Sequence, residues 1–180
     1  VEMVMQSIAL HDTVRVTTIH GEKKPRGIVL SCSLPFLPTD ERNLAYRAAE
    51  LFYKETGALL ETCEIHIEKR IPDAAAVLRA LNALHTAGLT DDELCEMGLK
   101  LGADVPFCLR GGTMLAQGIG EELSLLPDMP HCWVVLCKPP FAVPTKEVYQ
   151  EIDSVDILEH PDNKGMMAAL DQGDYEGVCA

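Results

Sequence analysis

Asp104 is the carboxylate whose setting in this chain best suits acid–base chemistry. It lies in the segment 101–107, Leu-Gly-Ala-Asp-Val-Pro-Phe, after a helix predicted to end on a left-handed Gly102 and before Val105-Pro106, which can begin the next helix. A carboxylate held between two rigid elements can accept or orient the proton of a substrate hydroxyl. It can equally cap the N-terminus of the second helix, and spacing alone does not separate these two interpretations.

Two other features have the residue types to contact a ligand. Gly118-Ile119-Gly120 is a lone Gly-x-Gly, which is typical of a hairpin turn and by itself only weakly indicates a ligand-binding loop. Lys69 follows an alternating strand and stands beside a predicted helix start, where a cation is either solvated or available to a phosphate group. Both readings stay open for each feature.

The segment Pro-Thr-Lys-Glu-Val-Tyr at 144–149 combines a hydroxyl with an aromatic ring. Thr145 is placed to cap a helix, and Tyr149 follows one helical turn later. Such a ring is either a partly buried core residue or a platform on which a nucleobase can stack.

Metal and disulfide chemistry are not predicted. None of the six histidines pairs at metal-ligand spacing, and the seven cysteines contain no Cys-x-x-Cys, so we expect reduced thiols and no metal site. No apolar run approaches the roughly 20 residues that a membrane span needs, and no signal peptide is visible. We therefore expect a cytoplasmic protein.

The charge of the chain restricts its partners. The formal net charge is −13, from 28 acidic and 15 basic side chains, and such a surface repels both nucleic acid and anionic lipid. We expect no nucleic-acid and no membrane partner. A polyanionic substrate would have to be captured by a local group of donors.

The elements that position these residues arrive in blocks of strands and helices, which favours an α+β sandwich over a doubly wound sheet. A helix is predicted from a cap at Thr39 or Asp40 to Gly57, another after Asp73, and a third opened by the capping box that Thr90 begins. Further helices are predicted at 145–152 and 162–170. The predicted strands are 13–18, 27–33, 63–67, 113–116, 122–126 and the buried run 132–137.

Taken together and in order, six blocks of this sequence resemble the GHMP kinase family over nearly the whole chain. Each block is weak alone, but the ordered series is specific. The blocks are 38–44 (Pro-Thr-Asp-Glu-Arg-Asn-Leu), 67–72 with 73–78, 101–107, 118–121, 138–140 and 144–149. The resemblance implies an α+β two-domain fold. A ribosomal-protein-S5-domain-2-like sandwich would cover 1–138, and the start of a ferredoxin-like C-terminal domain would cover 139–180.

The resemblance also implies an activity, which is ATP-dependent phosphorylation of a hydroxyl on the methylerythritol part of a cytidine diphosphate ester in the non-mevalonate isoprenoid pathway. Mg²⁺ on the phosphates is expected with it. Asp104 matches the catalytic carboxylate of the family. The implied ATP-binding residues are Asn43 and Lys69 on the adenine side, with Pro72 and Asp73 at the phosphate loop. The implied substrate-binding residues are Gly118, Ile119, Gly120, Thr145 and Tyr149, of which Tyr149 would stack on cytosine.

Departures from the family pattern are as informative as the matches. Family members carry a Pro-x-x-x-Gly-Leu-Gly-Gly-Gly-Ser-Ser loop that cradles the ATP phosphates, whereas here Pro72 is followed at once by Asp73. An N-terminal segment with a Lys that pairs with Asp104 would precede Val1, and a Gly-Ser-Gly motif would follow Ala180. We interpret these gaps as parts omitted from the sequence given.

Two alternatives remain beside the kinase. One is a catalytically silent module that keeps the cytidine site without holding ATP phosphates. The other is a GHMP kinase for mevalonate, homoserine or a sugar, against which Tyr149 argues because those substrates offer no base to stack. The expected assembly is a monomer or a homodimer.

Overall fold

The structure, a computed structural model, describes residues 1–21, 26–69, 74–137, 144–157 and 160–179. The chain divides into two compact units, residues 1–125 and 126–180, each described below by itself. The predicted domain boundary at 138/139 stays a prediction. The described strands are β1 (Glu2–Gln6), β2 (Thr13–Ile19), β3 (Gly27–Cys32), β4 (Thr62–Glu68), β5 (Thr113–Gln117) and β6 (Glu122–Leu125). The described helices are α1 (Leu44–Thr56), α2 (Ala75–Leu84), α3 (Asp91–Leu99), α4 (Val105–Arg110), α5 (Thr145–Asp153), α6 (Asn163–Gln172) and α7 (Tyr175–Cys179).

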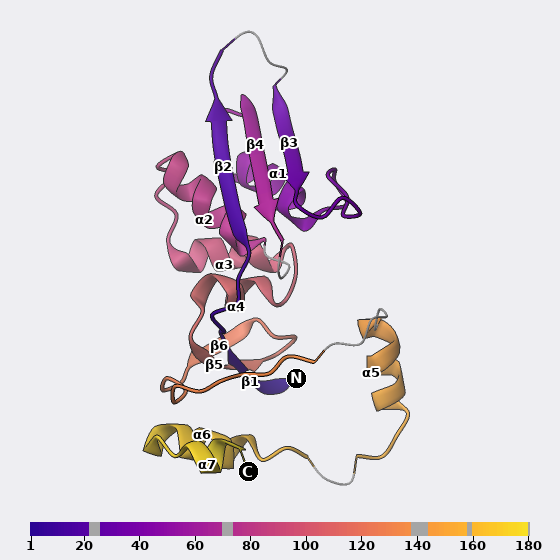
Figure 1. The fold of residues 1–180 in the computed structure, drawn as a ribbon, viewed down its shortest axis with the longest axis vertical. Helices are drawn as coiled ribbons and strands as arrows, with labels where there is room; N and C mark the ends of the chain where they lie inside the picture. The colour runs from indigo at the N-terminus through magenta and orange to yellow at the C-terminus, as the bar shows by residue number, and fades with distance from the viewer. Residues whose placement is uncertain (22–25, 70–73, 138–143, 158–159, 180) are drawn as a thin grey trace. The chain divides into compact units, whose positions relative to one another are not determined.

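The larger sheet of the first unit has the order β2-β4-β3, with β4 in the centre (Figure 1). β2 pairs antiparallel with β4, and β3 pairs parallel with it. The parallel pair needs a crossover, and α1 supplies it. β4 alternates, with Cys63, Ile65 and Ile67 buried against the helices. The predicted period-two strand is therefore confirmed, and its inward row points toward α1 and α2.

The core of this unit lies between that sheet and its helices. Small residues on α1, such as Ala45, Ala48 and Ala49, let the helix approach the sheet closely, and Phe52 fills the space beyond them. α2 contributes Val77, Leu78 and Leu81, all fully buried. The 3.6-residue spacing of these apolar positions is what made both helices predictable.

A second sheet has the order β1-β5-β6 and is antiparallel throughout. β1 and β5 pair from Glu2↔Gln117 to Gln6↔Thr113, which joins the start of the unit to its end. β5 and β6 form the predicted hairpin around Gly118-Ile119-Gly120. The predicted α+β class is confirmed by these two sheets with their helices.

Two predicted helix ends were wrong. α1 begins at Leu44 rather than after Thr39 or Asp40, because the side chain of Asn43 accepts the N–H of Ala45 and so caps the helix at 3.0 Å. Gly102 is not left-handed. α3 ends at Leu99 and the chain continues through right-handed turns, in which the Gly102 N–H donates to the Gly98 carbonyl. The capping box at Thr90 is confirmed.

The predicted buried strand at 132–137 was also wrong. These residues have no regular secondary structure, and Trp133 is 98% exposed. An apolar run becomes a strand only when another strand accepts and donates its backbone hydrogen bonds. No such partner lies in the part of the chain that the structure describes.

The second unit contains α5, α6 and α7. α6 begins where predicted, because the Asp162 carboxylate accepts the Gly165 N–H at 2.9 Å, and it ends at a left-handed Gly173. Among the residues described, no helix is long and apolar enough to cross a bilayer.

Candidate functional site

Asp104 stands at the N-terminus of α4 but does not cap it. Its backbone is helical, with φ −82° and ψ −13°, and its side chain makes no capping hydrogen bond. Instead its backbone carbonyl accepts the Cys108 N–H at 3.1 Å. Within the residues the structure describes, the exposed carboxylate has no hydrogen-bond partner. The capping interpretation is therefore not realised, and the carboxylate is available for chemistry.

The β5–β6 hairpin turn lies directly beside this carboxylate. A Cβ at position 120 would stand 3.7 Å from Oδ1 of Asp104 and 3.8 Å from Cβ of Ala103, so the glycine leaves this space open. Gly120 also has a φ of +122°, which favours glycine. Glu121 accepts the N–H of Ile119 at 2.7 Å and tightens the turn. The structure thus brings together Asp104 and the predicted 118–120 segment.

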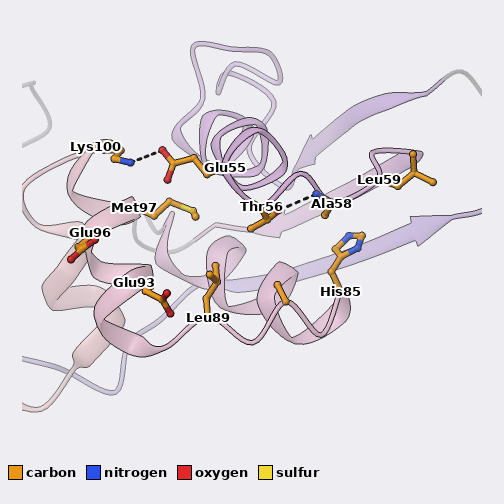
Figure 2. A pocket seen from close by; sticks show the side chains of 11 residues that line it. Glu55, Thr56, Ala58, Leu59, His85, Leu89, Glu93, Glu96, Met97 and Lys100 are labelled. Carbon is orange, nitrogen blue, oxygen red and sulfur yellow. Dashed lines mark hydrogen bonds and ion pairs between the residues drawn. The ribbon is translucent and has the colours of Figure 1, made fainter.

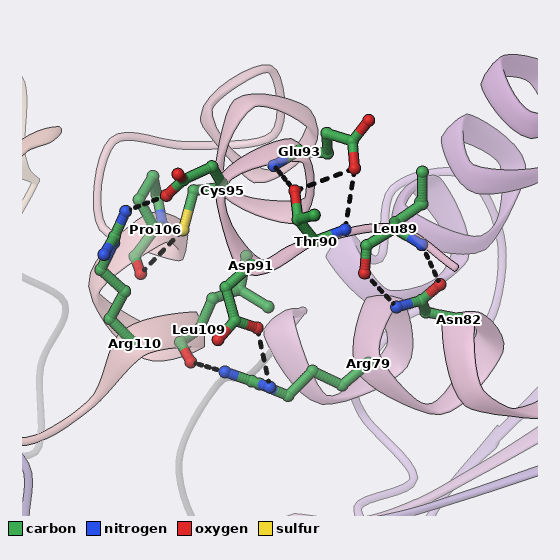
Figure 3. Close-up of polar contacts among 11 residues, drawn as sticks. Arg79, Asn82, Leu89, Thr90, Asp91, Glu93, Cys95, Pro106, Leu109 and Arg110 are labelled. Carbon is green, nitrogen blue, oxygen red and sulfur yellow. Dashed lines mark hydrogen bonds and ion pairs between the residues drawn. The ribbon is translucent and has the colours of Figure 1, made fainter. Parts of the chain in front are cut away.

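Charged side chains of α2 and α3 contact α4, which carries Asp104 at its N-terminus (Figure 3). Arg79 of α2 donates to the carbonyl oxygen of Leu109 near the end of α4 and also pairs with Asp91 at 3.2 Å. Arg110 pairs with Asp92 at the start of α3. The helix is only six residues long and would be marginal alone, so its buried side chains, Val105, Phe107 and Leu109, hold it in place together with the Arg79 hydrogen bond. The two exposed ion pairs add little.

Gly98 allows α3 and α4 to touch, and this contact can be tested. A Cβ at position 98 would lie 2.8 Å from Cγ1 of Val105 and 3.1 Å from Cδ1 of Leu109, both on α4. We expect Gly98→Ala to lower the free energy of unfolding by ~1–3 kcal/mol through overpacking, measured by urea denaturation. Gly88→Ala is the contrasting variant. Its Cβ would meet nothing within 4 Å, so a loss of stability there would come from the backbone strain at a φ of +72° and not from overpacking. An unchanged stability of Gly98→Ala would show that the helices separate freely.

Asn43 and Lys69 line one cleft of about 180 Å³ at the N-terminus of α1. The remaining lining residues are Leu37, Pro38, Arg42, Leu44, Ala45 and Ile67. The structure therefore brings together two residues that the sequence analysis assigned to one ligand. The floor is apolar and the polar groups are few, which is the usual composition of a site for a flat organic ring.

Asn43 is already partly engaged by its own loop. Its side-chain oxygen accepts from Ala45, and its Nδ2 donates to the Pro38 carbonyl at 2.8 Å. A side-chain amide has two donors and two acceptor sites, so one N–H and one lone pair remain for a ligand.

Lys69 is held by a carboxylate that the sequence analysis missed. Its Nζ lies 2.8 Å from Oδ2 of Asp12, whose side chain is fully buried, and the lysine side chain is itself only 15% exposed. The Lys69 backbone N–H donates to Oγ of Ser33 at 2.9 Å. Thr13 faces Glu68 in the β2–β4 register, so Asp12 and Lys69 form the next cross-strand pair.

Thr145 and Tyr149 lie on α5 in the second unit. The cap position is Pro144, Thr145 is the first helical residue, and no side chain caps this helix, so the predicted Thr145 cap was wrong. Tyr149 is 46% exposed, which leaves ring surface free for stacking. Pro72 and Asp73 lie outside the described residues.

A larger cavity of about 610 Å³ between α1, α2 and α3 contains none of the predicted site residues (Figure 2). Its charged groups serve the fold. Lys100 pairs with Glu55 at 2.5 Å, and Glu93 accepts the Thr90 N–H in the capping box, which lowers the pKa of Glu93. We therefore place the candidate site at Asp104 and at the Asn43–Lys69 cleft instead.

Known proteins resemble this chain over nearly all of its length. Residues 43–112 match the GHMP kinases N terminal domain. The chain is 44% identical over 187 residues to 4-diphosphocytidyl-2-C-methyl-D-erythritol kinase of Clostridium botulinum (strain Alaska E43 / Type E3), covering 98% of this chain and 65% of that protein. It is also 43% identical over 188 residues to the kinase of the same name from Enterococcus faecalis (strain ATCC 700802 / V583). That alignment covers 99% of this chain and 64% of the Enterococcus protein.

Solved structures agree. A crystal structure of 4-(cytidine 5'-diphospho)-2C-methyl-D-erythritol kinase matches with a TM-score of 0.60 at 30% identity, over 91% of this chain and 59% of that one. A crystal structure of mevalonate kinase from L. major, in complex with R-mevalonate, matches with a TM-score of 0.68 at 14% identity. It covers 98% of this chain and 65% of that one, and at this identity it shows a similar fold alone.

Both the extent and the gaps of these alignments are informative. The chain spans about 65% of the length of the first curated relative. That alignment covers 187 positions while this chain has 180 residues, so the relative contains at least seven residues that are missing from within this chain. A phosphate loop between Pro72 and Asp73 would be one such insertion, and its place stays a prediction.

Proposed function

We propose that this chain is a member of the GHMP kinase family and acts as an ATP-dependent kinase that phosphorylates a hydroxyl of 4-diphosphocytidyl-2-C-methyl-D-erythritol. The setting of Asp104 carries the proposal. Its carboxylate stands at a helix N-terminus without capping it, and a glycine turn keeps the adjacent space open.

In the proposed reaction Asp104 accepts the proton of the substrate hydroxyl as that oxygen bonds to the γ-phosphorus of ATP. The bond between the γ-phosphorus and the bridging oxygen breaks, and ADP leaves. Phosphoryl transfer needs mainly positioning and charge stabilisation. The packing of α4 through its buried Val105, Phe107 and Leu109, with the hydrogen bond from Arg79, supplies the positioning of this carboxylate.

The residues present fit the adenine ring of ATP. The Asn43–Lys69 cleft offers an apolar floor and hydrogen-bonding groups for adenine. The described residues contain no group of three or more potential metal ligands. That suits Mg²⁺, which is usually bound by one or two carboxylates together with substrate phosphates and water. When bound, Mg²⁺ would offset the charge that develops on the phosphates.

The direct test is incubation of the protein with 4-diphosphocytidyl-2-C-methyl-D-erythritol, ATP and Mg²⁺. We expect one ADP to form for each acceptor molecule that gains a phosphate. Mass spectrometry measures both products. Mevalonate and homoserine serve as competing acceptors. Faster transfer to either of them would contradict the proposed substrate.

A second candidate is a binding module that keeps the cytidine ligand but does not hold the ATP phosphates. The residues missing relative to the curated kinase favour it. Equilibrium binding of the cytidine ligand without any product would identify this module. The assembly, a monomer or a homodimer, remains a prediction.

Tyr149 is proposed to stack on the cytosine ring. We expect Tyr149→Ala to weaken binding of the cytidine substrate by ~1–3 kcal/mol, because base–aromatic stacking contributes that much. Tyr149→Phe keeps the ring and is expected to bind like the unaltered protein. Calorimetric titration measures both. An equal loss of ATP affinity in Tyr149→Ala would indicate a structural role instead.

A further inference from the structure

The cleft at Asn43 and Lys69 could suit two different ligand chemistries. It lies at the N-terminus of a 13-residue helix without acidic residues in its first turn, and two cations, Arg42 and Lys69, line it. A helix N-terminus with two cations is ordinarily a site for phosphate. An uncharged ring, such as a nucleobase, is the rival ligand.

Both cations are compensated by carboxylates. Arg42 donates to Asp40 twice, from Nε to Oδ1 at 2.9 Å and from Nη2 to Oδ2 at 2.7 Å. The hydrogen bond from Arg42 lowers the pKa of Asp40 from 3.8 to about 2, so this carboxylate stays ionised until the pH falls towards 2. Lys69 is paired with Asp12 at 2.8 Å.

The two pairs differ in how firmly they are held. The side chains of Arg42 and Asp40 are 74% and 41% exposed, so water and salt screen them. Asp12 is fully buried, and a buried carboxylate requires its cation because water cannot replace it. Asp12 therefore fixes both the place and the net charge of Lys69.

The helix N-terminus is also less open to an anion than its position suggests. Asn43 accepts from the Ala45 N–H, which removes one donor that a phosphate would use. What remains is an apolar floor, one free amide N–H, one lone pair and an ammonium group whose charge is balanced.

We propose that Asp12 is the positioning residue that makes this cleft select an uncharged ring over a phosphate, by holding Lys69 in place and neutralising it. This role of Asp12 rests on the proposed function. Within the nucleotide site, Asp12 would reserve this cleft for the base of the nucleotide and disfavour its phosphates there. Without the carboxylate, the ammonium group of Lys69 and the N-terminus of α1 would together attract an anion.

The test uses adenosine and inorganic pyrophosphate as separate probes in calorimetric titrations of the protein. Asp12→Asn keeps the shape of the side chain and removes its charge. We expect adenosine affinity to fall about 10-fold and pyrophosphate affinity to rise about 10-fold, since the carboxylate that offsets the charge of Lys69 is lost and its ammonium group can form charge-assisted bonds with the anion. Glu55→Gln, which removes a carboxylate from the exposed pair with Lys100, is the charge-matched control and should change neither.

A second variant separates selection from folding. Asp12→Asn alone removes the buried carboxylate from its pair with Lys69 and is expected to lower the melting temperature, whereas Asp12→Asn with Lys69→Gln removes both charges of the pair and should restore it in part. The double variant should still bind adenosine weakly and should show no gain in pyrophosphate affinity. If Asp12→Asn gains no pyrophosphate affinity over the unaltered protein, the inference is overturned.

The outcomes also separate this inference from the proposed function. If the selectivity changes as expected but no phosphoryl transfer occurs, the kinase proposal fails and the role of Asp12 stands. If transfer occurs and Asp12→Asn binds both probes normally, only the role of Asp12 fails. A protein that binds no adenosine at all contradicts both the inference and the adenine assignment.

Discussion

Asp104→Asn is expected to lower turnover by about 100- to 10,000-fold, the range usually attributed to one general base. The amide keeps the size of the side chain but cannot take up the hydroxyl proton. Binding of the cytidine substrate should stay nearly unchanged, because the carboxylate acts on the reacting hydroxyl. Steady-state kinetics combined with calorimetric titration measure the two effects separately, in a protein that carries out phosphoryl transfer.

Two comparisons make this result specific. Asp128→Asn removes a carboxylate from outside the segments that carry the site and should leave turnover unchanged. Gly120→Ala would place a methyl group in ordinary contact with Oδ1 of Asp104, at 3.7 Å, but at a φ of +122° that strains the backbone, and it should reduce turnover by shifting the turn beside Asp104. Turnover of Asp104→Asn within a factor of two of the unaltered protein would refute the catalytic role.

Insertion of an eleven-residue phosphate loop, of the family pattern Pro-x-x-x-Gly-Leu-Gly-Gly-Gly-Ser-Ser, at the Pro72–Asp73 junction is expected to raise ATP affinity by about 100-fold. Backbone N–H groups of the loop would then donate charge-assisted hydrogen bonds to the phosphates, and two such bonds at about a factor of ten each account for this gain. Isothermal titration with ATP measures the change. At least seven residues separate this chain from its curated relative, so an insertion of this kind restores a length that relatives have.

Adenosine is the internal control for that experiment. It has no phosphates, so its affinity should be the same with and without the inserted loop. A loop of equal length with alanines in place of the glycines should give little gain, because the backbone could not turn toward the phosphates. Equal gains for ATP and adenosine would mean that the insertion acts on the fold rather than on the phosphates.

Much of the fold could be predicted because its signals are local. The alternation of Cys63, Ile65 and Ile67, the capping box at Thr90 and the glycine turn at 118–120 each involve neighbours in sequence. The start of α1 was misplaced because Thr39, Asp40 and Asn43 are all good caps. In the structure Asp40 accepts from Arg42 two residues on, and Asn43 caps the helix, a choice that the residue types alone do not make.

The candidate site was predicted in part and for different reasons. Asp104 was found from its motif, but its uncapped carboxylate and its approach to Gly120 depend on contacts between distant segments. Asp12 was missed because β2 and β4 are not consecutive, so their register is invisible in the sequence. A signal did exist, since Asp12 and Lys69 each continue the inward row of their strand with opposite charge.

The run 132–137 shows the limit of apolarity as a guide. Its composition is that of a buried strand, yet Trp133 is almost fully exposed. The composition of a segment indicates how much free energy its burial would contribute. Burial itself also requires another surface against which the segment can pack. Among the residues described, the run 132–137 pairs with no strand.

The central place of β4 in its sheet has a consequence for measurement. Lys69 follows directly on this strand, which is hydrogen-bonded on both sides. Amide protons in such a strand exchange with solvent only when a large cooperative part of the unit opens. A ligand in the cleft binds the closed form, so its occupancy should slow deuterium uptake across the whole sheet rather than at the cleft alone.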